Sequence, residues 1–220
     1  MLVLTYTEEN YLKAIYSIGG AHSTGEVSVN EIAERMQTRP ATVTDMLRKL
    51  SEKGLINYEK YKKITLSKAG AKMALGIVRK HRLWESFLYS KLNFSWDEVH
   101  EVAEQLEHIQ SAKLMERLDE FLGYPEYDPH GDPIPKQNGE MPKSTAQLLS
   151  EKTVGANCKI VAVKDTNSAF LQQLERIGLK IGSKLTVAEI MPYDKSMVVK
   201  NDGGKSLQLS HIIATNLLVL

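Results

Sequence analysis

The sequence predicts a mainly α-helical protein with a small β component, built as an N-terminal winged helix-turn-helix, a helical domain and a C-terminal antiparallel β-barrel. Three short helical patterns come first, followed by a pair of strand-like runs. Longer amphipathic helical patterns come next, and a stretch with five of the seven prolines separates them from five strand-like runs. These changes predict an N-terminal domain over 1–72, a helical domain over 73–123, a linker over 124–147 and a β domain over 148–220.

The N-terminal domain begins with a predicted helix over about 8–18. Thr7 is its expected N-cap, and two consecutive glycines end it. Ser28, with Glu31 three residues later, has the pattern of a capping box and begins a second, short helix. Pro40 falls in the first turn of a third helix, where its missing N–H is tolerated. The strand-like runs that follow predict a β-hairpin.

Helix, tight turn, helix and hairpin is the order of a winged helix-turn-helix, whose second helix lies in the major groove of DNA. The first turns of this helix are expected to face base edges and carry Arg39, Pro40, Ala41, Thr42 and Thr44. Arg48 on the same helix and Lys62 in the hairpin are expected to contact phosphates. Helix-turn-helix motifs also serve protein–protein contact. DNA is favoured because ten Lys and Arg residues outnumber six Asp and Glu between Glu26 and Lys72, although the net charge of the chain is only +1.

The stretch from His81 to His108 is rich in groups that bind metals. It holds three of the six histidines, and residues 93–108 contain five carboxylates but no Lys or Arg. Helical spacing places four of these residues on one stripe, namely His100, Glu104, Glu107 and His108. His81 and Glu85 form a second pair, one turn apart, on the preceding helix. Imidazoles and carboxylates together suit a divalent metal. A solvated acidic face is the alternative, but such a face usually interleaves Lys with Glu.

The helical domain also carries more apolar surface than its short helices need for one subunit. Part of this surface is therefore expected to form a dimer interface, and two-fold symmetry is what paired half-sites on DNA require. The single cysteine, Cys158, is typical of a protein from a reducing cytosol. No window approaches the ~20 apolar residues of a membrane span, and the N-terminus has no basic region typical of a signal peptide. We therefore expect a cytoplasmic protein with no membrane partner.

Five segments carry a resemblance to a known family: TEENYLKAIY, RPATVTDMLRKLSEKGLI, RKHRLWESFL, VHEVAEQLEHIQS and PHGDPIP. On these segments the chain resembles, from end to end, the diphtheria toxin repressor and manganese transport regulator family of metal-dependent transcriptional regulators. The β domain resembles the SH3-like domain of iron-transport proteins. The resemblance implies an SH3-like C-terminal barrel and a homodimer that binds double-stranded operator DNA when metal is bound.

The resemblance further implies two metal sites per subunit. The ancillary site is matched by His81, Glu85 and His100. The primary site is matched by Glu104, Glu107 and His108, with a remaining ligand on the first helix, where this chain has Asn10. In some members the SH3-like domain adds oxygen ligands to the ancillary site, and Asp165 lies near that region.

The resemblance also guides the choice of metal. Iron-responsive members have Cys at the position of Glu104 and Met at that of Asn10, whereas manganese-responsive members have Glu and Asp. Glu104 thus follows the manganese pattern, while Asn10 follows neither and offers an uncharged carbonyl oxygen. Mn²⁺ is the expected cofactor and Fe²⁺ the alternative, with Zn²⁺ or Co²⁺ able to bind in vitro.

The expected function is a repressor that senses Mn²⁺ or Fe²⁺ and controls metal-homeostasis genes, and the chain is not expected to be an enzyme. Two alternatives stay open. One is a dinuclear metallohydrolase, which would need an open coordination position beside a substrate cleft. The other is a winged-helix repressor whose acidic helix is structural, so that DNA binding ignores metals.

Overall fold

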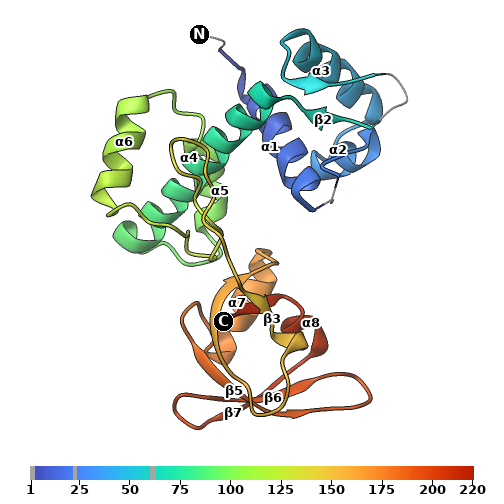
Figure 1. Cartoon of the computed structure of the whole chain (residues 1–220). Coiled ribbons are helices and arrows are strands. Elements are labelled where there is room, and N and C mark those ends of the chain that lie inside the picture. Colours follow the sequence, from blue (N-terminus) through green and yellow to red (C-terminus); the bar gives the residue numbers. More distant parts are fainter. Residues whose placement is uncertain (1–2, 22–23, 60–62) are drawn as a thin grey trace. The chain divides into compact units, whose positions relative to one another are not determined.

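The computed structural model describes residues 3–21, 24–59 and 63–220 (Figure 1). Contacts divide the chain into two compact units. Unit 1 comprises Met1–His81, Gln105–Ser111 and Pro135–Glu140, and unit 2 comprises Arg82–Glu104, Ala112–Ile134 and Met141–Leu220. No helix among the described residues is long and apolar enough to cross a membrane.

Unit 1 begins with helix α1 (Tyr6–Ala21), which starts earlier and ends later than predicted, because Gly19 and Gly20 lie inside the helix instead of ending it. Thr7 lies inside the helix, so its prediction as the N-cap was wrong. The cap is Thr5, whose Oγ1 accepts a hydrogen bond from the Glu8 N–H at 3.3 Å while its own N–H donates to the Glu8 carboxylate at 2.9 Å. Thr5 and Glu8 have the spacing of a capping box, which adds about half a turn to the helix.

The next two helices form as predicted. Helix α2 (Val29–Arg35) begins at a capping box in which Ser28 and Glu31 satisfy each other's backbone N–H groups. A tight turn at Gln37, with φ of 48°, leads to helix α3 (Pro40–Glu52), which has Pro at its first turn. The wing consists of the short antiparallel strands β1 (Ile56–Asn57) and β2 (Thr65–Leu66).

One apolar core unites these elements in unit 1. Leu12 and Ile15 of α1 are almost fully buried in the same cluster as Leu47 of α3. Full burial of one such side chain contributes roughly 1.5–3 kcal/mol. Because α1 and α3 pack in the same core, we expect that an interaction that restrains the position of α1 also restrains the position of α3.

Helices α4 (Lys68–Leu92), α5 (Val99–Leu106) and α6 (Ala112–Phe121) follow. The acidic helix, whose predicted stripe runs on to His108, is shorter than expected, because α5 ends at Leu106. Glu107 and His108 therefore lie in the turn after α5, where the Ile109 N–H donates to the Leu106 carbonyl at 3.1 Å. The helix ends here because His108 and Gln110 contact Glu9 of α1 rather than continue the helical pattern.

The linker contains no helix, but its PHGDPIP segment is ordered in unit 2. Asp128 Oδ1 accepts hydrogen bonds from the N–H groups of His130 and Asp132 at 2.8 and 2.9 Å. The carbonyl of His130 accepts from the N–H of Val163 at 3.0 Å, which attaches the segment to a strand of the C-terminal domain.

The C-terminal domain is a six-stranded antiparallel sheet in the order β3-β8-β4-β5-β6-β7. Its strands are β3 (Gln147–Leu148), β4 (Asn157–Val163), β5 (Lys184–Ile190), β6 (Met197–Asn201), β7 (Ser206–Leu209) and β8 (Leu217–Val219). Three helices accompany them, the 3₁₀ turn η1 (Leu149–Glu151), α7 (Ser168–Ile177) and α8 (His211–Ala214). The five predicted strands are present, and β3 was missed. With the helices of unit 1, this sheet confirms the predicted fold class.

Residues of the helical domain take part in the core of this sheet domain. Trp96, only 3% exposed, belongs to the apolar cluster formed mainly by the strands and α7. Its neighbour Asp97 accepts hydrogen bonds at Oδ2 from Gln172 and Ser168 at 2.7 and 2.8 Å. These bonds, with that from Ser95, lower the pKa of Asp97 to about 2. Within unit 2, the segment before α5 therefore contacts the C-terminal domain both through the apolar side chain of Trp96 and through the hydrogen bonds of Asp97.

Candidate metal centre

The first cluster of metal-binding groups lies in unit 1, where three chain segments meet. Glu9 comes from α1, His81 from α4, and Glu107 and His108 from the turn after α5. Glu107 is fully buried, and the other three are 5–7% exposed. His108 Nδ1 lies 2.6 Å from Glu9 Oε2, and His81 Nδ1 lies 2.6 Å from Glu107 Oε2. The structure therefore brings together three residues that the sequence singled out, and adds Glu9.

Two lysines and an amide complete the surroundings of these carboxylates. Lys13 Nζ is 2.7 and 2.8 Å from the two carboxylate oxygens of Glu107. Gln110 Nε2 donates to Glu9 Oε1 at 2.6 Å, and Lys80 Nζ is 3.9 Å from the same oxygen. Sequence reasoning missed Glu9 and Lys13. The available signal was their spacing, because Glu9 and Lys13 are one turn apart on a helix whose Leu12 and Ile15 point inward.

Asn10 provides the test of whether these residues fit a metal. Its side-chain oxygen is buried and has no hydrogen-bond donor among the described residues. Leaving a buried acceptor unsatisfied costs about 1–3 kcal/mol, and a bound cation would remove that cost. Oε1 of Glu107 also lacks a hydrogen bond of good geometry, although Lys13 forms an ion pair with it. Carboxylate, amide and imidazole groups without sulfur suit Mn²⁺, with Fe²⁺ and Zn²⁺ also compatible. The residues fit.

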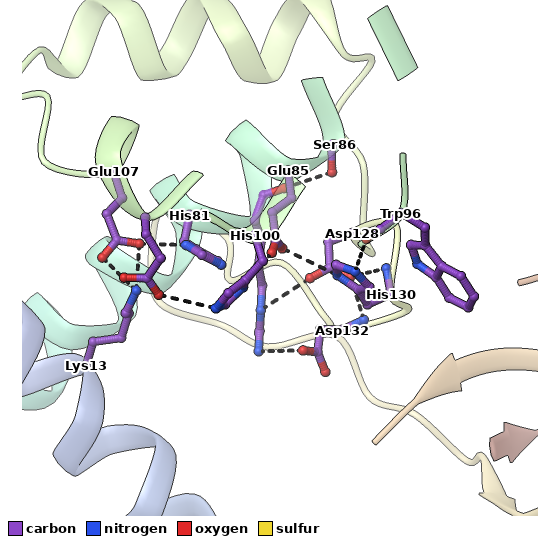
Figure 2. Close-up of polar contacts among 12 residues, drawn as sticks. Lys13, His81, Glu85, Ser86, Trp96, His100, Glu107, Asp128, His130 and Asp132 are labelled. Carbon is purple, nitrogen blue, oxygen red and sulfur yellow. Dashed lines mark hydrogen bonds and ion pairs between the residues drawn. The ribbon is translucent and has the colours of Figure 1, made fainter. Parts of the chain in front are cut away.

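A second cluster lies in unit 2 around Glu85 of α4, which is only 2% exposed. His100 Nδ1 is 3.1 Å from Glu85 Oε1 (Figure 2). His100 Nε2 is 3.5 Å from Glu104 Oε1. The structure thus brings together Glu85 and His100, which the resemblance assigns to the ancillary site, and places Glu104, assigned to the primary site, next to His100. His81 precedes Glu85 by one turn of α4 and makes its contact with Glu107 in unit 1.

The PHGDPIP segment adds two residues that sequence reasoning did not assign. Glu85, Asp128 and His130 are all buried, and each offers a ligand atom within 4.8 Å of the others. His130 Nε2 donates to the Trp96 carbonyl at 3.0 Å, so its Nδ1 faces Glu85 Oε2 at 3.8 Å. The presence of Asp and His in a proline-rich segment was the only sequence signal.

The guanidinium of Arg82 partly compensates the negative charge of the carboxylates in this second cluster. Arg82 Nε lies 3.7 Å from Asp128 Oδ2, and its terminal nitrogen lies 3.4 Å from Asp132. Burial, reinforced by repulsion from Glu85, nevertheless raises the pKa of Asp128 to about 8. Burial lowers the pKa of His130, but its interactions with Glu85 outweigh this and raise it overall. Asp165 has a local contact instead: its Oδ1 accepts from the Asn167 N–H at 2.8 Å, just before α7.

The predicted DNA-reading residues lie on or beside α3. Arg39, Pro40, Ala41 and Thr42 are exposed. The hydroxyl of Thr44 donates to the Pro40 carbonyl at 3.0 Å, which leaves its methyl group as the part able to touch a base. Arg48 is exposed and pairs with Asp45 at 3.2 Å. Lys62 lies outside the described residues. These base and phosphate contacts stay predictions.

Three family profiles match the chain in succession. They are the iron dependent repressor N-terminal DNA binding domain over residues 3–64, the iron dependent repressor metal binding and dimerisation domain over 67–136, and the FeoA domain over 147–220. Among solved structures, a manganese-dependent transcriptional repressor in complex with manganese shares 35% identity, with a TM-score of 0.85 over 97% of this chain and 99% of that one. The manganese regulator SloR shares 33% identity, with a TM-score of 0.75 over 99% of both chains.

The curated proteins similar to this chain include repressors of the same kind. The diphtheria toxin repressor of Corynebacterium glutamicum is 27% identical over 218 residues, which are 94% of this chain and 92% of that protein. The iron-dependent repressor IdeR of Mycobacterium leprae is 33% identical over 133 residues, and this match spans only 56% of IdeR.

A DNA-binding domain, a metal-binding and dimerisation domain and a FeoA domain in this order define a class of metal-dependent transcriptional repressors. The chain belongs to the iron-dependent repressor family, which includes the diphtheria toxin repressor. The predicted resemblance is thereby confirmed, including that of the C-terminal domain.

Proposed function

We propose that this protein is a cytoplasmic homodimer that represses metal-homeostasis genes by binding double-stranded operator DNA when Mn²⁺ is bound, with Fe²⁺ as the alternative metal. Asn10 follows Glu9 on α1 and has a buried side-chain oxygen. The observation that carries the proposal is the buried cluster of Glu9, Glu107 and His108 in unit 1. It joins α1, which shares a core with the DNA-reading helix α3, to the turn after α5.

The proposed ligands follow from this cluster and from the family. Asn10, Glu107 and His108, with Glu104, would hold the primary metal, and Glu9 is an additional oxygen donor in direct contact with His108. His81, Glu85 and His100 would hold the ancillary metal. The bound ion would supply positive charge between these carboxylates. The domain boundaries at 72, 123 and 147 are proposed with these assignments.

The protein's own residues then transmit the effect. When Glu9 and Asn10 are held against the turn that carries Glu107 and His108, α1 is fixed. Leu12 and Ile15 carry this restraint to α3 through their common core. In a homodimer, fixing both α3 helices sets their separation, and half-sites on DNA require about 34–36 Å.

A hydrolase is the less favoured reading. The donors of the first cluster are 0–7% exposed, whereas metal catalysis needs an open coordination position beside a substrate. We therefore propose that the chain is not an enzyme.

The experiment uses a duplex selected from random-sequence DNA by the manganese-loaded full-length protein. Its affinity is measured in chelator and with Mn²⁺, Fe²⁺, Co²⁺ and Zn²⁺, at one fixed ionic strength because phosphate contacts are salt-dependent. We expect weak binding in chelator and tight binding with Mn²⁺. Full affinity in chelator would favour the metal-independent repressor, and phosphoesterase activity with Mn²⁺ would favour the hydrolase.

A further inference from the structure

The buried carboxylate of Glu107 is neutralised by a lysine of the same unit. Figure 2 shows Lys13 reaching from α1 to this carboxylate. Its Nζ lies 2.7 Å from Oε1 and 2.8 Å from Oε2, so the ammonium lies within ion-pair distance of both oxygens. Glu107 is fully buried, and the side chain of Lys13 is only 15% exposed. Lys13 follows Asn10 by three residues, which places the two side chains on adjacent positions of one helix face.

This placement conflicts with metal binding at the same carboxylate. Removing one partner of a buried ion pair is strongly destabilising, so Glu107 needs Lys13 while no metal is bound. An ion ligated by Glu107 would lie beside the same oxygens, and an ammonium and a divalent cation repel each other twice as strongly as two single charges at the same distance. Lys13 and a divalent ion therefore cannot both occupy this place.

We propose that Lys13 is a built-in competitor for the metal, whose ammonium must leave Glu107 before a divalent cation binds there. The lysine thereby sets the metal concentration at which the protein responds. This inference rests on the proposed function in one respect, namely that Glu107 is a metal ligand. It adds that metal affinity is held below what the ligands alone would give.

The test compares Lys13→Met, which keeps the aliphatic stem, and Lys13→Gln, which keeps a hydrogen-bond donor, with the wild-type full chain. The affinity for Mn²⁺ is measured by calorimetric titration of metal-free protein, and the thermal midpoint is measured with and without Mn²⁺. Both substitutions are expected to tighten Mn²⁺ binding by about tenfold or more, because they remove the competing cation. They are also expected to lower the midpoint of the metal-free protein and to leave that of the saturated protein near the wild-type value.

Lys53→Met is the matched control. Lys53 pairs with Glu8 at 2.6 Å in the same unit, and Glu8 is not among the proposed ligands. This variant is expected to lose stability without any change in Mn²⁺ affinity. Unchanged or weaker Mn²⁺ binding by both Lys13 variants would overturn the competition. Absence of Mn²⁺ binding by the wild type and every variant would overturn the proposed function, and the competition with it.

Discussion

Replacing Glu107 with Gln is expected to abolish the response of DNA binding to metal. In the wild type, metal is expected to strengthen operator binding by about 5- to 150-fold, the usual range of allosteric coupling. Gln keeps the size of the buried side chain but removes the charge that both Lys13 and a metal would meet. The variant should therefore bind the selected duplex equally weakly in chelator and in Mn²⁺.

The measurement is operator affinity for the variant, the wild type and a control, Glu101→Gln, which changes an exposed carboxylate of α5 outside the proposed ligands. Far-ultraviolet circular dichroism establishes that each protein is folded. A Glu107→Gln protein that still responds to Mn²⁺ like the wild type would exclude Glu107 from the responding site.

Replacing Gly131 with Ala is expected to cost about 3 kcal/mol or more of folding free energy. Gly131 has φ of +85°, which L-residues reach at a cost of roughly 1–2 kcal/mol. A Cβ here would also lie 2.0 Å from the Val161 carbonyl oxygen and 2.4 Å from Ala162 Cα. Both are backbone atoms of β4, so the PHGDPIP segment would have to separate from the strand, at a further cost of about 1–3 kcal/mol.

Gly155→Ala is the matched control, because it carries the positive-φ cost without the clash. Gly155 has nearly the same φ, +89°, but its Cβ would meet nothing within 4 Å. Denaturant unfolding of the metal-free proteins should therefore show a clearly larger loss for Gly131→Ala than for Gly155→Ala. Equal losses would mean that the segment does not lie against β4 as described.

The sequence predicted those elements whose ends are determined by residues close together in the chain. Ser28 and Glu31 form their capping box within four residues, and Pro40 begins α3 through its own ring geometry. Alternating apolar residues likewise predicted five strands of the C-terminal sheet. Strand β3 was missed because only two residues form it, and its pairing of Leu148 with Leu218 joins positions far apart in the chain.

The candidate site was predicted in part for the same reason. Histidines and carboxylates at helical spacing indicated Glu107 and His108, but not that both lie in a turn. That turn forms through the contact of His108 with Glu9, 99 residues away. Lys13 carries no ligand signal at all, and its role emerges only from its distance to Glu107. Asp128 and His130 come near Glu85 through the ordering of a segment that has no periodicity to read.

Metal binding and DNA binding are expected to be coupled through the contact of α1 with the turn after α5. The most direct test of this coupling is the Mn²⁺ affinity of the wild-type protein, measured by titration with and without the selected operator duplex. Operator DNA is expected to tighten Mn²⁺ binding by the same factor by which Mn²⁺ tightens DNA binding, because coupling free energy is reciprocal. Equal Mn²⁺ affinity in the presence and absence of the operator would contradict the coupling.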